Sequence, residues 1–159
     1  MPPGTSISRI GTRIAFAALS SGFPANKIRR IDAQTRVITR IAGTGDYTFN
    51  RDGLSALATN LWPGDLAFDP SGSLAFVDVF SHRIRRIDSQ TGIVSTILGN
   101  GKLGDLGDLG LATDAQTSAN AISFDQQGNL YVSSGNRVRE VYANTGMIAA
   151  TPRLRSLSP

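Results

Sequence analysis

The sequence predicts an all-β protein made of repeated four-stranded antiparallel sheets. Three observations support this fold class: short apolar segments rich in β-branched residues, frequent turn sequences and a long internal repeat. The composition agrees, because 17 glycines and 7 prolines among 159 residues indicate many turns, and 40% apolar residues indicate a folded chain. Residues 54–61 are expected to form one short helical turn at most.

The internal repeat is the strongest signal in the sequence. Residues 26–35 (NKIRRIDAQT) recur as residues 82–91 (HRIRRIDSQT), an offset of 56 residues (26 to 82). A second block at residues 66–74 (LAFDPSGSL) returns at the same offset as residues 122–130 (ISFDQQGNL). Residues 136–141 (NRVREV) are a shorter third copy of the first block. Such periodicity predicts a fold in which each copy forms one structural unit.

The best-preserved copy contains four expected strands, at residues 66–68, 74–77, 82–87 and 93–98. Turn sequences separate them, DPSG at residues 69–72 and DSQTG at residues 88–92, and GNG follows at residues 99–101. Short strands joined by such turns predict an antiparallel meander. One meander cannot bury both of its apolar faces, so copies are expected to stack around an axis as the blades of a β-propeller.

The chain is therefore predicted to be an incomplete β-propeller of about two and a half to three four-stranded blades. Residues 1–159 are interpreted as one repeat region, with a partial blade at residues 7–45, blades at residues 64–101 and 120–150, and an irregular tail at residues 151–159. The first copy departs from the others at its turn, where Arg36 stands in the place of Gly92.

The segments 82–88, 91–92 and 125–130, with the Gly-Thr-Gly and Asp-Gly-x-x-Ala-Thr type loops between them, resemble NHL repeats of the long, bacterial and teneurin-like kind. The resemblance covers roughly residues 14–148. It implies a six-bladed type of propeller, so the chain is expected to be a fragment of a larger propeller, a truncated copy, or a half-ring that self-associates. The fold hosts many activities, so the resemblance names none of them.

Catalytic residues and cofactors are not expected. The only histidine is His82, there is no cysteine for a metal site, and Asn26 and Asn136 hold the place of His82 in the other copies. The remnant of a metal-dependent propeller enzyme, lactonase-like or lyase-like, stays an alternative because of Asp78, although Ala18 and Ser134 do not repeat the acid. The remaining loop acids are interpreted as turn residues rather than calcium ligands: Asp46, Asp52, Asp105, Asp108 and Asp114.

Arginines recur on the equivalent strand of each copy, and they are the candidate binding residues: Arg29, Arg30, Arg83, Arg85, Arg86, Arg137 and Arg139. Equivalent strands lie at equal radius, so these side chains are candidates for a positive belt. The resemblance implies single-stranded RNA binding as one use, but stacking on bases needs exposed aromatic residues, and Tyr47, Trp62 and Tyr142 are scattered and unrepeated. The favoured interpretation pairs the arginines with turn carboxylates such as Asp32 and Asp88.

The preferred function is a non-catalytic scaffold that presents a protein-binding surface, with contacts made by the loops at residues 43–63 and 99–119. RNA binding through the arginine belt is the main alternative, and the net charge of +4 permits it without requiring it. The sequence identifies neither the protein partner nor the compartment. Arg9 and Arg13 precede the apolar residues 14–19 in the order of a signal peptide, but a worn blade strand is preferred there. No apolar run approaches the ~20 residues of a membrane span.

Overall fold

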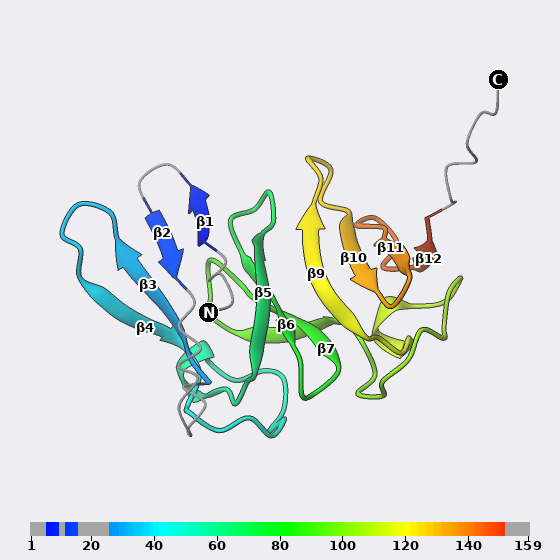
Figure 1. Ribbon diagram of the computed structural model, residues 1–159, viewed down its shortest axis with the longest axis horizontal. Helices are drawn as coiled ribbons and strands as arrows, with labels where there is room; N and C mark the ends of the chain where they lie inside the picture. Colours follow the sequence, from blue (N-terminus) through cyan, green and yellow to red (C-terminus); the bar gives the residue numbers. More distant parts are fainter. Residues whose placement is uncertain (1–5, 10–11, 16–25, 152–159) are drawn as a thin grey trace.

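The computed structural model describes residues 6–9, 12–15 and 26–151. They form three four-stranded antiparallel sheets that lie side by side (Figure 1). The first sheet contains β1 (Ser6–Arg9), β2 (Thr12–Ala15), β3 (Ile28–Asp32) and β4 (Ile38–Ala42). The second contains β5 (Pro63–Phe68), β6 (Leu74–Asp78), β7 (Arg83–Ile87) and β8 (Val94–Leu98). The third contains β9 (Ala119–Phe124), β10 (Leu130–Ser134), β11 (Arg137–Val141) and β12 (Ile148–Ala150).

The predicted fold class is confirmed. Each sheet follows the chain order, so it is a simple meander, and the three sheets do not close into a ring (Figure 1). The first sheet, where we expected a partial blade, also has four strands. Ala18, residues 16–19 of the apolar N-terminal stretch and residues 152–159 of the tail lie outside the described residues.

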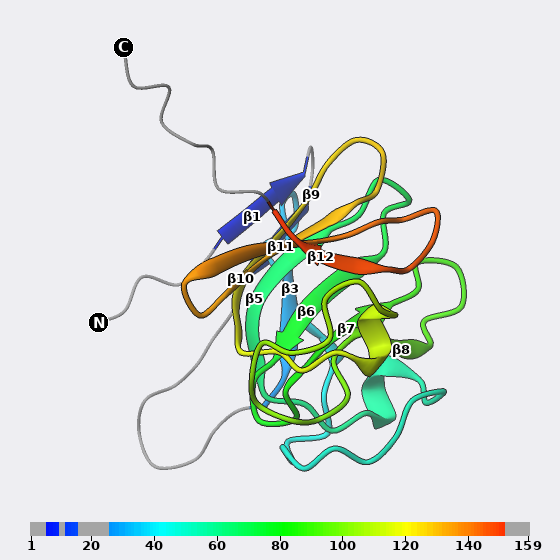
Figure 2. The ribbon, with the colours of Figure 1, turned by 90° about the vertical axis from the view of Figure 1, so that its right-hand side faces the viewer.

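Two single turns of 3-10 helix interrupt the loops before the second and third sheets. The turn η1 (Ala56–Ala58) lies within residues 54–61, where the sequence predicted one helical turn, and η2 (Ala112–Asp114) is its equivalent. In Figure 2 the two turns, coloured cyan and yellow-green, lie on the same side of the molecule. No helix in the described part of the chain has the length and apolar character needed to cross a membrane.

Turn chemistry sets the same register between the third and fourth strands of the first two sheets. The carboxylate of Asp88 accepts hydrogen bonds from the backbone of Gln90 and Thr91 and from the Thr91 hydroxyl, and Asp32 does the same one repeat earlier. Beyond the turn, Arg29 pairs with Arg40 on β4 as Arg85 pairs with Thr96 on β8, and a register shift precedes both pairs. The two hairpins are therefore equivalent residue by residue.

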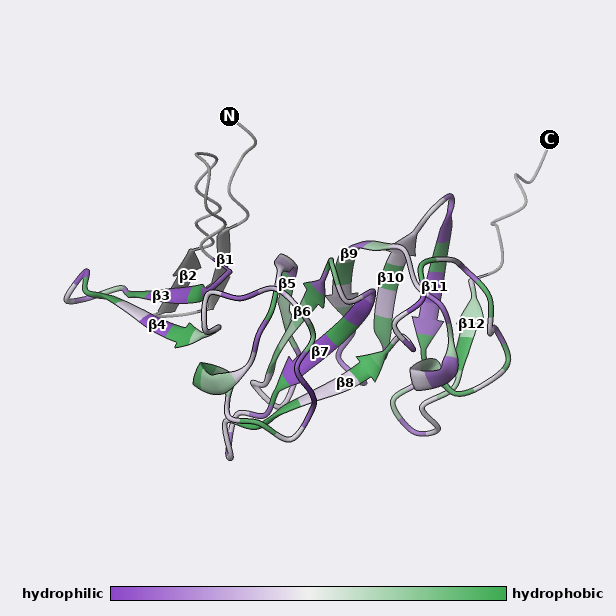
Figure 3. Ribbon diagram, turned by 90° about the horizontal axis from the view of Figure 1, so that it is seen from below, coloured by the Kyte–Doolittle hydropathy of each residue, from purple (hydrophilic) through white to green (hydrophobic). Residues whose placement is uncertain are grey.

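Two apolar layers hold the sheets together. One lies between the first and second sheets and includes Ile28, Leu66 and Phe76; the other lies between the second and third sheets and includes Val77, Ile122 and Val132. Strand β6 is buried at every position because it faces both layers. Figure 3 shows hydrophobic segments on β5, β6, β9 and β10, and hydrophilic segments on β7 and β11. Those hydrophilic segments carry the recurring arginines.

Candidate binding face

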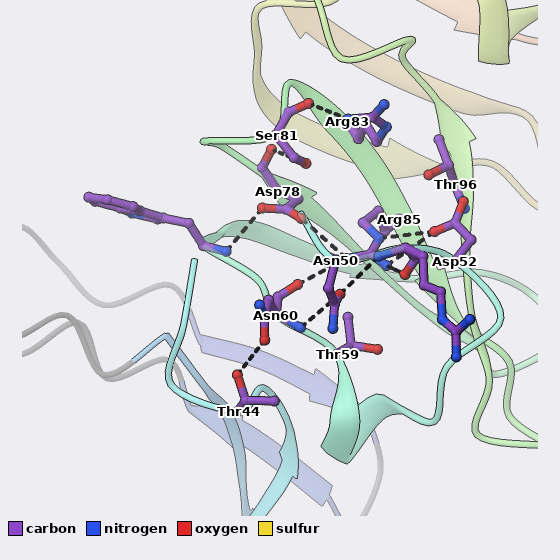
Figure 4. A network of polar contacts seen from close by, with 12 residues as sticks. Thr44, Asn50, Asp52, Thr59, Asn60, Asp78, Ser81, Arg83, Arg85 and Thr96 are labelled. Carbon is purple, nitrogen blue, oxygen red and sulfur yellow. Dashed lines mark hydrogen bonds and ion pairs between the residues drawn. The ribbon is translucent and has the colours of Figure 1, made fainter. Parts of the chain in front are cut away.

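The loop at residues 43–63 is fastened to the second sheet by one buried arginine. Arg85 on β7 has a fully buried side chain, and its guanidinium group lies 3.1 Å from the carboxylate of Asp52 and 3.4 Å from that of Asp78 (Figure 4). It also donates hydrogen bonds to the backbone carbonyls of Asn60 (3.0 Å) and Arg51 (2.8 Å). A planar group with five donors suits this task, because one side chain satisfies several acceptors at once.

The loop at residues 99–119 is fastened to the third sheet in the same way. Arg139 on β11 is fully buried, and its Nε donates to Asp108 at 2.8 Å. Its Nη1 donates to the carbonyl of Gln116 at 2.7 Å. Asp108 and Gln116 stand 56 residues after Asp52 and Asn60 (52 to 108, 60 to 116), so the whole arrangement repeats. Two of the five loop acids that the sequence assigned to turns, Asp52 and Asp108, are thus the partners of the buried arginines.

The carboxylate of Asp78 also orients the end of the loop at residues 43–63. Its Oδ1 accepts the backbone N–H of Trp62 at 3.0 Å. Burial raises the pKa of Asp78 above its ordinary value, and the hydrogen bonds from Trp62 and the charge of Arg85 only partly oppose this. Asp78 therefore stabilises the position of Trp62 while its own charge is held in a dry environment.

The third sheet obtains the same effect from a different residue. Ser134 replaces Asp78, and its Oγ accepts the backbone N–H of Ser118 at 3.1 Å. A carboxylate from the loop, Asp105, accepts hydrogen bonds from the hydroxyls of Ser134 and Ser118. The hydrogen bond from Ser134 is the main reason why the pKa of Asp105 lies below its ordinary value. The third sheet thus has a serine where the second has Asp78, and the loop residue Asp105 supplies the carboxylate instead.

The other candidate arginines differ in exposure, so the recurring positions do not form one uniform belt. Arg86 pairs with Asp69 at 2.7 Å and with Asp88 at 3.8 Å, as the favoured interpretation predicted for Asp88. Arg83 is half-buried and donates to the carbonyls of Ser81 and Asn100. Three are exposed: Arg29, Arg30 and Arg137. Polyanion binding by the accessible arginines stays a prediction.

Neither His82 nor the acids gather into a metal site in the described part of the chain, where no group of three or more histidine or carboxylate side chains is placed to hold an ion. His82 has a φ of +49° and Asn26, its equivalent, a φ of +28°, so both serve a turn in the left-handed region. Asp46 and Asp114 contribute backbone carbonyls, which accept hydrogen bonds from Leu61 and Asn100.

Three exposed aromatic side chains meet at the end of the second sheet. The ring centroids of Tyr47 and Trp62 are 5.7 Å apart, those of Tyr47 and Phe80 are 4.7 Å apart, and Trp62 and Phe80 are stacked at 6.1 Å. The prediction that Tyr47 and Trp62 are scattered is therefore wrong, because the loop brings both to the β6–β7 turn, which carries Phe80. Tyr142 lies apart, in the turn after β11. We call Tyr47, Trp62 and Phe80 the aromatic cluster.

The surroundings of the aromatic cluster are apolar and basic. Phe49, from the same loop, lies under the guanidinium group of Arg83, with 4.1 Å between Cζ and the ring centroid. A cleft of about 240 Å³ opens between the second and third sheets, and its lining is mixed, with Val79 and Leu103 beside polar residues such as Arg83. The cluster is not repeated, because the positions equivalent to Tyr47 and Trp62 are Leu103 and Ser118. This asymmetry gives the second sheet a surface that the third lacks.

No protein-family model and no curated protein matches this sequence, whereas solved structures of propeller proteins do match it. A protein of unknown function from Bacteroides thetaiotaomicron has a TM-score of 0.67 and 18% identity over 88% of this chain and 32% of that one. An auxiliary nutrient binding protein from Bacteroides ovatus has a TM-score of 0.60 and 19% identity, covering 89% and 35%. A gluconolactonase from Xanthomonas campestris has a TM-score of 0.55 and 15% identity, covering 91% and 44%.

The chain thus spans 32% to 44% of the length of these three proteins. At such low identity the likeness shows the fold alone, which is that of a β-propeller.

Proposed function

We propose that the chain is a non-catalytic, NHL-type propeller segment that binds a protein partner through the aromatic cluster. The observation that carries the proposal is the contact of three exposed aromatic rings on a rigid support. Exposed aromatic side chains that touch one another are typical of protein-binding surfaces. Tryptophan and tyrosine, with arginine, dominate the binding energy of such surfaces.

The hydrogen bonds that hold the loop beneath the aromatic cluster support a binding role for these exposed rings. Asp78 holds the backbone of Trp62, and Arg85 holds the loop that carries Tyr47, so a partner meets rings that are already in place. Pre-organised side chains lose little conformational entropy on binding, which strengthens the complex. The nutrient binding neighbour and the gluconolactonase show that related folds serve both binding and catalysis. The turn role of His82 and the ion pairs of the loop acids favour binding here.

The proposal is tested by selecting peptides from a displayed random library on the folded chain. We expect selected peptides to be rich in apolar residues and to bind the variants Trp62→Ala and Phe80→Ala at least about tenfold more weakly. Tyr142→Ala is the matched control, because Tyr142 is an exposed aromatic residue outside the cluster. Equal affinity for Trp62→Ala and the unchanged chain would remove the cluster from the binding surface.

Single-stranded RNA is a second candidate, and one observation favours it. The aromatic residues that base stacking requires are gathered in one place, and the same loop carries Phe49, whose ring lies against the guanidinium group of Arg83. Titration of a labelled oligouridine at low and high salt separates the two ligands. A salt-dependent complex that weakens in Trp62→Ala would support RNA as the ligand. If no complex forms at low salt, RNA is removed and a protein partner is the remaining candidate.

A further inference from the structure

The loops that precede the second and third sheets each form an isolated β-bridge with the outer edge of the sheet, flanked by backbone hydrogen bonds. Gly53 donates its N–H to the carbonyl of Val94 on β8, and Val94 donates back to the carbonyl of Leu54, both at 2.9 Å. On β12, Ile148 accepts the N–H of Leu109 at 2.7 Å and donates to Gly110 at 3.0 Å. The outermost strand of each sheet is thus paired by a segment that arrives from the preceding repeat.

The same segment delivers the aspartate that binds the buried arginine. Asp52 directly precedes Gly53, and its two carboxylate oxygens accept hydrogen bonds from Arg85 and from the backbone of Thr96 (2.9 Å). Asp108 precedes Leu109 and binds Arg139. An aspartate followed by two residues that hydrogen-bond to the outermost strand is therefore the ligand of the sheet edge, and the residue after the aspartate has a positive φ in both loops, +82° at Gly53 and +69° at Leu109.

The first sheet has the receiving half of this arrangement without the ligand. Its β3–β4 hairpin has the same register as β7–β8, so Arg29 and Ile38 correspond to Arg85 and Val94. Ile38 is 57% exposed, whereas Val94 and its third-sheet equivalent Ile148 are 0% exposed. Arg29 is exposed and forms no ion pair with any described residue. Strand β4 lies at the outer margin of the molecule in Figure 1.

The chain itself offers no side-chain carboxylate to complete this site. No aspartate or glutamate precedes Asp32, and residues 152–159 contain none. The loops at residues 43–63 and 99–119 are each committed to their own sheet by Arg85 and Arg139. Among the described residues, the β3–β4 hairpin at the outer edge of the first sheet therefore combines an exposed arginine without a carboxylate partner and an exposed isoleucine.

We propose that the outer edge of the first sheet binds an aspartate-containing segment from outside residues 1–159, of the kind that residues 52–54 provide to the second sheet. The aspartate pairs with Arg29, and the backbone after it hydrogen-bonds to Ile38, which its apolar side chains cover. This surface is separate from the aromatic cluster, so the inference does not depend on the function proposed above.

The probe is a labelled peptide with this chain's own residues 48–61 (TFNRDGLSALATNL), titrated into the full chain and followed by fluorescence anisotropy. We expect saturable binding that weakens at least about tenfold when the peptide carries Asp52→Asn or when the protein carries Arg29→Gln. A peptide methylated at the nitrogen of Gly53 keeps its charge but loses the donor to the edge strand, and it is expected to bind equally weakly. Arg30→Gln, an adjacent exposed arginine, is the matched control and is expected to change the affinity less than twofold.

Three kinds of result would count against this inference. Binding that is absent at millimolar peptide, or that is equal for Arg29→Gln and the unchanged protein, would show that the edge is not a site for such a segment. A chain that dimerises in sedimentation experiments, and that becomes monomeric in Arg29→Gln, would make a second copy the occupant instead. Weak peptide binding by Trp62→Ala would likewise contradict the separation of the two surfaces.

Discussion

Arg85 and Arg29 occupy the same position in equivalent strands, yet Arg85 is fully buried among carboxylates and Arg29 is exposed. The hairpins that carry them share their register, their turn aspartate and the register shift before the arginine. The difference comes from the loop at residues 43–63, which brings Asp52 and a hydrogen-bonded backbone segment to the edge of the second sheet. The structural unit of this protein is therefore a sheet together with the loop that precedes it, and the first sheet has only part of that unit within the described residues.

The sharpest way to break this comparison is to remove the two arginines in turn. Arg85→Ala leaves the buried carboxylate of Asp78 without its cation, and we expect it to lower the free energy of unfolding by about 3–5 kcal/mol. Arg29→Ala removes an exposed side chain, for which about 0.5 kcal/mol or less is expected. Urea unfolding of both variants measures the difference. Equal losses would mean that Arg29 is as well satisfied as Arg85.

The apolar residues at the outer edge extend the same test. Ile148→Ala is expected to destabilise the chain by about 2–5 kcal/mol, because it opens a cavity under the loop at residues 99–119. The equivalent change Ile38→Ala removes a side chain that is mostly in water, and its expected effect is within about 0.5 kcal/mol. Thermal unfolding of the two variants measures these effects. A large loss of stability in Ile38→Ala would indicate that another segment covers Ile38 on β4.

The turns between the third and fourth strands of the first two sheets differ at two positions, and one of these, Arg36 in the place of Gly92, predicts that a substitution there increases stability. Arg36 has a φ of +60° where Gly92 and Gly146 have +69°. Because a side chain in the left-handed region costs roughly 1–2 kcal/mol, Arg36→Gly is expected to stabilise the chain by up to about 1 kcal/mol after the greater freedom of glycine in the unfolded state.

Gly92→Arg is the reverse control for the turn. A Cβ at Gly92 would meet no atom within 4 Å, so the backbone conformation is the main opposition to a side chain there. We expect a loss of about 1–2 kcal/mol in urea unfolding. A neutral result for both variants would show that these turns tolerate side chains without strain.

The smallest expected effect concerns pH, and it separates the second sheet from the third. The pKa of Asp78 is raised above 3.8, so its contribution opposes folding at neutral pH and is relieved as the pH falls through that raised value. The pKa of Asp105 is lowered, so its stabilising contribution is present above 3.8 and is lost as the pH falls below it. The equivalent polar networks thus respond to acid with opposite signs.

Urea midpoints between neutral and acidic pH measure this contrast. Asp78→Asn is expected to lose more stability on acidification than the unchanged chain, whereas Asp105→Asn is expected to lose less. The two substitutions are compared as changes with pH, which removes their constant effects on packing. If both variants differed from the unchanged chain in the same direction in how their stability changes with pH, the opposite pKa shifts assigned to Asp78 and Asp105 would be contradicted.

Much of the fold could be predicted because its signals are local. The turn at Asp88 is written in consecutive residues, and the repeat at 56 residues marks the strands that it connects. The partners of Arg85 could not be found in this way, because Asp52 lies 33 residues earlier in a loop without a regular pattern. Trp62 and Phe80 belong to different elements, and no periodicity relates them, so the aromatic cluster was missed. The one hint in the sequence was that the third copy has no counterpart of Trp62 or Phe80, which marks both as residues outside the repeated pattern.

The sequence by itself determined the strands, the turns and the repetition of a four-stranded sheet, because these depend on the chemistry of neighbouring residues. Only the tertiary structure decided which of the equivalent residues are buried. Burial at Arg85 and exposure at Arg29 depend on whether a loop from the preceding repeat reaches the sheet edge. A side chain's environment is thus set by segments distant in the chain, and equal sequences acquire different physical roles.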